Sequence, residues 1–168
     1  MIIWSIMEMP TVSQAFFNAF VKSMSSSLGI GSPDGTPPRA ALEAVAAEHR
    51  IVNALTFGPA LVIDGEEQQI NKEYGYNPNG KEPRAALGQM GSLRYVLVIA
   101  EGRGESSGVS QQELAHFMAE LGCVQAFNLD GGNSAEMVFG EKMYKGMPGG
   151  DERGLSDIIY FATAVPEE

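Results

Sequence analysis

The chain has few of the residues that build covalent or metal-based sites. Cys123 is the only cysteine among 168 residues, so neither an intrachain disulfide nor a cysteine-based zinc site can form. The two histidines, His49 and His116, do not occur in a metal-binding motif. The acidic residues that follow Asp130 lack the alternating spacing of an EF-hand calcium loop. The sequence therefore predicts no metal and no cofactor.

Positive charge and long apolar runs are also scarce. Eleven basic residues against twenty-one acidic ones give a net charge of −10, which repels nucleic acids and anionic membrane surfaces. A nucleic-acid partner is therefore not expected. No segment approaches the ~20 apolar residues that span a bilayer, and the short apolar run at 1–7 lacks the basic start of a secretory signal. The sequence identifies neither a compartment nor an oligomeric state.

The chain divides into two regions of different pattern. With 168 residues and 44% apolar content it can bury one sizeable core, but it is too short for two independent domains. Residues 1–50 form a predicted helical segment, with helices at about 12–24 and 39–49 and a linker at 25–38 rich in serine, glycine and proline. Residues 51–168 have short extended segments and tight turns, and form the predicted domain.

Hairpins dominate the second region. Asp64-Gly65 follows a short apolar run and is the strongest turn signal of a two-residue hairpin. Residues 90–92 separate two further apolar segments and predict a second hairpin, and a third is expected after residue 134. The predicted strands are 61–63, 85–89, 93–100, 124–129, 135–139, 142–144 and 157–165.

One helix is predicted between two of these strands. Ser110 and Glu113 form a capping box, an apolar stripe follows, and Gly122 ends the helix. A strand, a helix and a strand in this order predict a right-handed crossover that joins parallel strands. The expected fold is therefore α/β (mixed α+β), with a mixed sheet, hairpins, one β-α-β crossover and flanking helices. The loops after both strands would face one crevice.

Two carboxylates follow these strands. Asp130 ends an apolar run and precedes Gly131 and Gly132, which permit positive φ and a close approach by a ligand. Glu101 follows the other strand. At neighbouring strand ends, ~4.8 Å apart, such a pair suits sugar chemistry, with ~5 Å between carboxyl groups implying retention and ~6.5–9.5 Å inversion. The alternative is that Asp130 caps its own turn and Glu101 only accepts hydrogen bonds from loop amides.

Two arginines are candidates for binding an anion. The guanidinium groups of Arg84 and Arg103 offer a planar fork that suits phosphate, although Arg84 could equally be a solvated surface residue. The glycine-rich loop around Arg103 lacks the lysine of a Walker motif. Ser134 has neither the strand-to-helix elbow nor the histidine partner of a serine hydrolase, so that chemistry is not favoured.

Several segments, in the same order along the chain, resemble the phosphodiester glycosidase family, which includes bacterial exopolysaccharide biosynthesis proteins. The resemblance runs from about residue 52 to 164. The matching segments are Phe57-Gly58-Pro59, Leu61-Val62, Asp64-Gly65, Pro83 to Gly88, Glu101-Gly102-Arg103, Gly108-Val109-Ser110, Glu113-Leu114-Ala115 and Asn128 to Ser134.

The resemblance implies hydrolysis of the bond between a sugar anomeric carbon and a phosphodiester oxygen, in a phosphorylated glycan or a cell-envelope polysaccharide. It implies catalytic roles for Asp130 and Glu101, and a substrate pocket formed by Arg84, Arg103, Asn128, Gly131, Gly132, Asn133 and Ser134. Residues 1–50 contain no counterpart of the family's upstream portion, so we expect an N-terminally incomplete member. The alternatives are a relative that binds a sugar phosphate without cleaving it, and a stable fragment with no ligand.

Overall fold

The computed structural model describes residues 2–8, 43, 46–47, 57–72, 77–139, 141–145, 153–155 and 158–160, the first range by its backbone alone. The predicted helix at 12–24 and the predicted linker at 25–38 lie outside these residues. So do most of the predicted helix at 39–49 and most of the predicted strand at 157–165.

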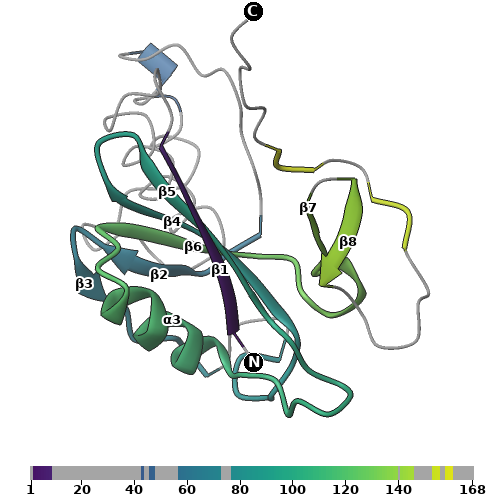
Figure 1. Cartoon of the computed structure of the whole chain (residues 1–168). Helices are drawn as coiled ribbons and strands as arrows, with labels where there is room; N and C mark the ends of the chain where they lie inside the picture. Colours follow the sequence, from purple (N-terminus) through teal and green to yellow (C-terminus); the bar gives the residue numbers. More distant parts are fainter. Residues whose placement is uncertain are drawn as a thin grey trace, which may run out of the picture.

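The strands form one large sheet and one hairpin, and a single α-helix of several turns lies in the described region (Figure 1). The six-stranded sheet has the order β1-β5-β4-β6-β2-β3, and its hydrogen-bonded neighbours run antiparallel. The α+β class is confirmed. The sheet elements are β1 (Ile2–Glu8), β2 (Ala60–Ile63), β3 (Glu66–Glu67), β4 (Arg84–Gly91), β5 (Arg94–Ala100) and β6 (Gln125–Leu129), and helix α3 (Gln111–Glu120) connects β5 to β6.

The β-α-β crossover is present, but its strands are not neighbours. β5 and β6 run in the same direction, and β4 lies between them, antiparallel to both. The crossover therefore joins strands of the same direction, as predicted, but the expectation that their ends are neighbours is wrong. The expectation that both strands end at the same edge of the sheet is confirmed, because two strands antiparallel to a third share a direction.

The three predicted hairpins are confirmed. Between β2 and β3, Asp64 and Gly65 have φ angles of 52° and 86°, as a two-residue turn with two positive φ values requires. Ser92 and Leu93 separate β4 from β5, and Leu93 has a φ of 60°. The third hairpin consists of β7 (Met137–Phe139) and β8 (Lys142–Lys145).

The apolar run at the start of the chain forms a strand that the sequence did not predict. β1 pairs with β5 along its whole length, from Ile2 opposite Ala100 to Glu8 opposite Arg94. The run has too few residues for its periodicity to identify a partner strand nearly a hundred residues away. The apolar run therefore allowed a conclusion about a secretory signal but not about a strand.

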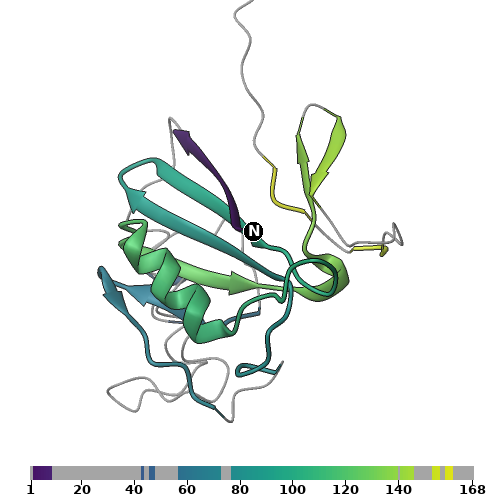
Figure 2. The same ribbon diagram turned by 60° about the horizontal axis from the view of Figure 1, so that its bottom comes forward.

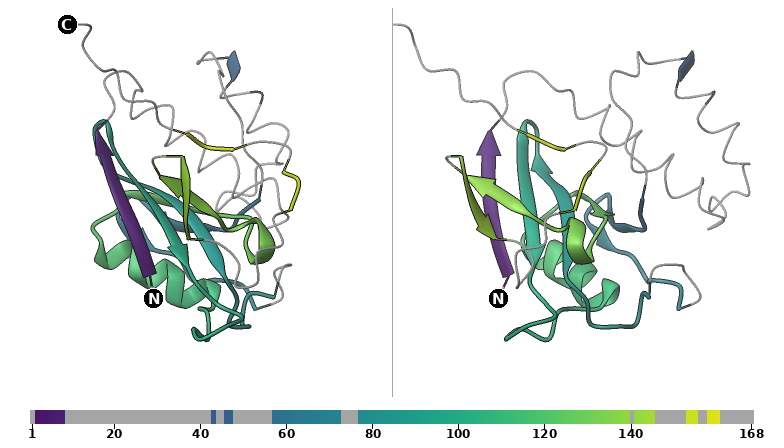
Figure 3. Two further views of the ribbon diagram at one scale, coloured as in Figure 1. Left: turned by 45° about the vertical axis from the view of Figure 1, so that its right-hand side comes forward. Right: turned by 90° about the vertical axis from the view of Figure 1, so that its right-hand side faces the viewer.

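Helix α3 covers one face of the large sheet, and the β7–β8 hairpin lies on the other side (Figures 2 and 3). The capping box is confirmed, because Glu113 N donates to Ser110 Oγ at 3.2 Å and Ser110 N donates to Glu113 Oε2 at 2.7 Å. Gly122, with φ of 80°, follows the helix. Within the described residues, no helix is long and apolar enough to cross a membrane.

Side chains alternate between the two faces of the sheet. The core beneath α3 contains Ala86, Val96, Val98 and Ala126 from the strands, together with Leu114 and Met118 from the helix. The opposite face carries a second apolar cluster with Leu87, Tyr95 and Phe127, against which Leu97 and Leu129 pack. Each residue of β4, β5 and β6 can therefore be assigned to a face, and this assignment decides which side chains can reach the same cavity.

An exposed histidine connects α3 to β3. His116 Nδ1 lies 2.9 Å from Glu67 Oε2, and His116 Nε2 lies 3.5 Å from Glu120 Oε1. The hydrogen bond to Glu67 is the main cause that raises the pKa of His116, and the two carboxylate charges add to it. The same hydrogen bond lowers the pKa of Glu67. The pair therefore stabilises the fold most when the imidazole is protonated and the carboxyl is ionised.

We predict that the His116→Ala variant loses thermal stability mainly between about pH 4.5 and 6.5, the ordinary pKa values of the two groups. The histidine contribution is complete below its unfolded pKa and disappears as pH rises through the higher folded pKa. The glutamate contribution is complete above its unfolded pKa and disappears as pH falls through the lower folded pKa. Melting temperatures across this range would measure the effect. Glu67→Gln should give the same profile, and the double variant no further loss; a pH-independent difference would contradict the prediction.

Candidate functional site

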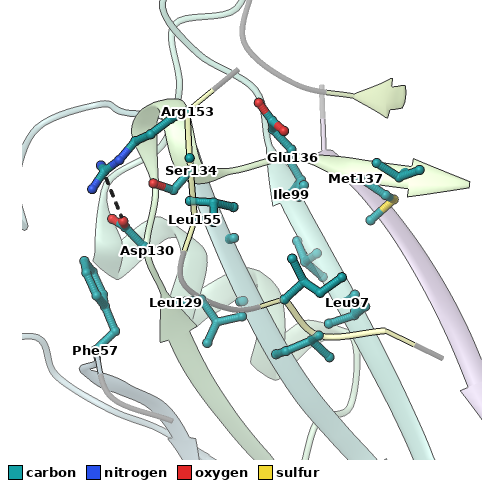
Figure 4. A pocket seen from close by; sticks show the side chains of 17 residues that line it. Phe57, Leu97, Ile99, Leu129, Asp130, Ser134, Glu136, Met137, Arg153 and Leu155 are labelled. Carbon is teal, nitrogen blue, oxygen red and sulfur yellow. Dashed lines mark ion pairs between the residues drawn. The ribbon is translucent and has the colours of Figure 1, made fainter. Parts of the chain in front are cut away.

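The face opposite α3 carries a cavity of about 610 Å³ (Figure 4). This volume lies within the range of ~300–1,000 Å³ that small-molecule sites occupy. Its floor comes from β4, β5 and β6, and residues at 134, 136–138, 153–155 and 158–159 line much of the rest. The sheet residues whose side chains lie on this face and line the cavity are Ala85, Leu97, Ile99 and Leu129.

Among the described residues, four polar side chains line this cavity. Asp130, Ser134, Glu136 and Arg153 lie among the apolar residues, and Figure 4 shows the first two beside Arg153. Asp130 Oδ1 accepts a hydrogen bond from Gly131 N at 2.9 Å, so the residue does cap its own turn. Asp130 Oδ2 lies 3.9 Å from Arg153 Nη1. One carboxylate oxygen therefore supports the loop, and the other pairs loosely with the arginine.

Ser134 adds a hydroxyl group at the same end of the cavity. It lies in the short 3₁₀ turn η1 (Gly132–Ser134) that follows Asp130. Its Oγ is buried and accepts or donates no hydrogen bond within the described part of the chain. A buried hydroxyl without a partner has a free-energy cost, which a bound ligand with a complementary group would remove.

Glu101 does not line the cavity with Asp130. β4 separates the strands that these residues follow, so their strand ends are two strand spacings apart, ~9.6 Å, rather than one. The expectation of two carboxylates at neighbouring strand ends is therefore wrong. The second carboxylate of the cavity is Glu136.

Arg84 lies away from the cavity. It starts β4 on the same face as Ala86, toward α3, and is only 4% exposed. Its Nη2 donates to the carbonyl oxygens of Asn77 at 2.7 Å and Gly80 at 3.0 Å, and its Nε donates to that of Val109 at 3.2 Å. Burial lowers the pKa of this guanidinium. The structure thus places Arg84 where it holds a loop and the β5–α3 connection against the sheet.

Asn128 is also on the α3 side. It is fully buried, and its Nδ2 donates to the carbonyl oxygen of Gly58 at 2.8 Å. Gly58 N in turn donates to Asn128 O at 3.0 Å. Asn128 therefore fixes the segment before β2, and the structure does not bring its side chain to the cavity that Asp130 lines.

Arg103 joins the loops that follow β5 and β6. Its Nη2 and Nε lie 2.7 and 2.8 Å from Glu82 Oε2, and its Nη1 donates to Asn133 Oδ1 at 3.3 Å. The hydrogen bonds from Arg103 are the main cause that lowers the pKa of Glu82. The two loops are therefore in contact, but they do not share the predicted crevice, because only the loop of Asp130 lines the cavity. Arg103 and Asn133 do not line the cavity, but they support the turn next to it.

The glycine pair after Asp130 has a packing role. A Cβ atom at Gly131 would lie 2.4 Å from the carbonyl oxygen of Pro83, which real Cβ contacts do not approach. Gly132 N donates to the same oxygen at 3.0 Å, and Gly132 has a φ of 57°. The turn therefore lies directly against the residues before β4, and its first residue must lack a side chain.

Sequence reasoning missed Glu136 and Arg153 as cavity residues. Glu136 belongs to no motif, and its one signal in the sequence is a negative charge close to the predicted phosphate site. Arg153 stands in a segment without a periodic pattern, and its contact with Asp130 joins residues that are far apart in the sequence. In the described ranges no three histidine, cysteine or acidic side chains are grouped so that they could hold a metal ion.

The sequence profile of the family described as Phosphodiester glycosidase matches residues 26–162, beginning upstream of the predicted domain boundary at residue 51. The chain is 31% identical over 108 residues to the SPbeta prophage-derived uncharacterized protein YomE of Bacillus subtilis, covering 64% of this chain and 17% of YomE. It is 33% identical over 76 residues to N-acetylglucosamine-1-phosphodiester alpha-N-acetylglucosaminidase of Mus musculus, covering 45% of this chain and 15% of that protein.

A solved structure is also similar. It is the crystal structure of a hypothetical protein from Synechocystis, with 26% identity, a TM-score of 0.48, and coverage of 55% of this chain and 18% of that one. The chain therefore spans less than a fifth of the length of each of these three proteins.

We predict that Gly131→Ala destabilises the protein by about 1–3 kcal/mol, the usual cost of overpacking against a backbone that cannot move aside. Gly131 has a φ of −118°, so the cost comes from the contact with Pro83 and not from backbone strain. Urea unfolding would measure it. The matched control is Gly154→Ala, where a Cβ meets nothing within 4 Å and no loss is expected. Equal stability of the two variants would show that the loop adapts.

Proposed function

The chain belongs to the phosphodiester glycosidase family, and on this premise we propose that it hydrolyses the bond between a sugar anomeric carbon and a phosphodiester oxygen. The observation that supports this most directly is the loose pairing of Asp130 with Arg153 at the polar end of the cavity. The substrate would be a phosphorylated glycan or a related sugar phosphodiester.

The chemistry of the leaving group determines what the site must provide. When the sugar C1–O bond breaks, the bond electrons stay on a phosphate monoester, whose second pKa is about 6. Such a group leaves without first being protonated near neutral pH. The reaction therefore needs a base that takes a proton from the attacking water, and a cation beside the phosphate oxygens, whose charge increases by one.

Asp130 and Arg153 match these two requirements. A carboxylate at the end of a strand can accept the proton of the water that attacks C1. A guanidinium next to it can bind the phosphate with two parallel hydrogen bonds and stabilise its growing charge. In this proposal Arg153 takes the role predicted for Arg84, because the donors of Arg84 already bind carbonyl groups on the other face.

Glu136 would be the second acidic group of the site, with Glu101 as the alternative that the family resemblance implies. With Asp130 and Arg153, Glu136 gives the cavity lining a net charge of −1 when all three groups are ionised. A dianionic product is repelled by this charge more strongly than a monoanionic phosphodiester. The excess negative charge would therefore favour release of the phosphate product.

We predict that Asp130→Asn lowers kcat by about 10²–10⁴-fold, the usual contribution of a general base. The amide keeps the size of the side chain and its oxygen can still accept from Gly131 N, so the melting temperature should change little. Turnover of an N-acetylglucosamine 1-phosphodiester would be measured, with Glu66→Gln on β3 as an exposed acidic control. Undiminished turnover would remove Asp130 from the mechanism.

We further predict opposite effects for two charge variants. Arg153→Gln should lower kcat/KM by about tenfold or more, the value of a charged hydrogen bond to phosphate. Glu136→Gln should lower KM, because it removes a negative charge from the site of an anionic substrate. A sugar phosphate that binds the wild type without product formation would instead favour a non-catalytic relative.

A further inference from the structure

Three of the four polar side chains in the described lining, those of Asp130, Ser134 and Arg153, lie together, and Glu136 lies apart from them beside Ile99 (Figure 4). Leu97 and Leu129 form the floor that extends away from these groups. The other side chains of the described lining are largely apolar, with Phe57, Met137, Val138, Leu155, Ile158 and Ile159. A ligand that fills this cavity therefore meets hydrogen-bonding groups at one end and aliphatic side chains over most of its length.

Apolar side chains also surround the opening. Ile158 is 73% exposed and Val138 is 63% exposed, and both line the cavity. Exposed apolar groups that continue into a cavity are typical of a binding surface for an apolar ligand.

From this arrangement we propose that the group esterified to the phosphate, opposite the sugar, is an apolar chain of alkyl or prenyl type. The proposal rests on the function proposed above, and it names the leaving group of that reaction. The sugar and the phosphate would lie near Asp130 and Arg153, and the alkyl or prenyl chain would lie over Leu97 and Leu129.

The alternative leaving group is a second sugar, and the lining argues against it. Each sugar hydroxyl that leaves water needs a new hydrogen-bond partner, because an unpaired buried hydroxyl costs free energy. The described lining provides such partners near Asp130, Ser134 and Glu136, enough for one sugar. The floor side chains Leu97 and Leu129 offer a second sugar no hydrogen-bonding group, whereas an alkyl chain would bury apolar surface against them.

The test compares leaving groups of increasing length. N-acetylglucosamine 1-phosphate would be esterified with methyl, butyl or octyl alcohol, or with the 6-hydroxyl of mannose, and kcat/KM would be measured for each. We expect kcat/KM to rise with chain length, by up to about fourfold for each methylene that is fully buried. Equal values for the methyl and octyl esters, or a higher value for the mannose ester, would overturn the proposal while supporting the hydrolase function.

Binding separates this proposal from the proposed reaction. If no ester is cleaved, the hydrolase function fails, and calorimetry with methyl phosphate and octyl phosphate still tests the apolar floor. Octyl phosphate should bind at least about tenfold more tightly, since only a few buried methylenes are needed for that difference. Equal affinities would overturn the proposal. A hexadecyl ester in phosphatidylcholine vesicles, compared with the octyl ester in solution, would identify a membrane lipid or a soluble compound as the source.

A pair of variants tests whether the preference for octyl over methyl phosphate comes from the cavity. Ile158→Asn changes an exposed side chain that lines the cavity, and Tyr160→Asn changes one of equal exposure that does not. Both positions are on the surface, so both variants should fold, which their melting temperatures would verify. We expect the first variant to reduce the ratio of octyl to methyl affinity severalfold and the second to leave it unchanged. If the ratio of octyl to methyl affinity were the same in both variants and the wild type, the alkyl chain would not bind in the cavity, and the proposal would be overturned.

Discussion

The backbone of Glu82 and Pro83 passes so close to two loops that glycines of these loops have no room for a side chain, and the candidate site depends on this contact. A Cβ atom would lie 2.9 Å from Pro83 N at Gly102, 2.7 Å from Glu82 at Gly108, and 2.4 Å from Pro83 O at Gly131. The cause is the strand order. Because β4 lies between β5 and β6, the residues before β4 must run between the loops that follow those strands. The position of Asp130 follows from this packing and not from its own loop alone.

The sequence predicts those parts of the fold that local physics decides. Asp64-Gly65 adopts positive φ at both positions because few other pairs do so without strain, and Ser110 with Glu113 satisfies amides that any helix start leaves free. Strand order, in contrast, is not decided by local residues. A crossover helix is compatible with adjacent strands and with strands that leave room for a third, and no pattern within residues 93–129 distinguishes them. This is why the shared edge was predicted correctly and the carboxylate spacing was not.

The prediction of the candidate site was incomplete for a related reason. Consecutive residues of a strand point to opposite faces, so a motif that identifies a segment does not identify which side chains share a cavity. Ala85 and Leu129 line the cavity, while their neighbours Arg84 and Asn128 hold loops on the α3 side. Arg153 could not be found in this way, because its contact with Asp130 joins segments that no local signal relates.

The three arginines near the strand ends differ in how firmly they are held. Arg84 and Arg103 already donate hydrogen bonds shorter than 3 Å, to a carbonyl group and to Glu82, and a ligand would have to replace these. A phosphate would therefore have to compete with contacts that each guanidinium already makes. Arg153 is 60% exposed and lies 3.9 Å from Asp130, beyond hydrogen-bond distance, so moving its guanidinium to a phosphate costs little. In the proposed reaction, the same movement would free the Asp130 oxygen to accept a proton from water. A weak ion pair would suit this role better than a strong one, since each partner would have to leave the other before either could act on a substrate.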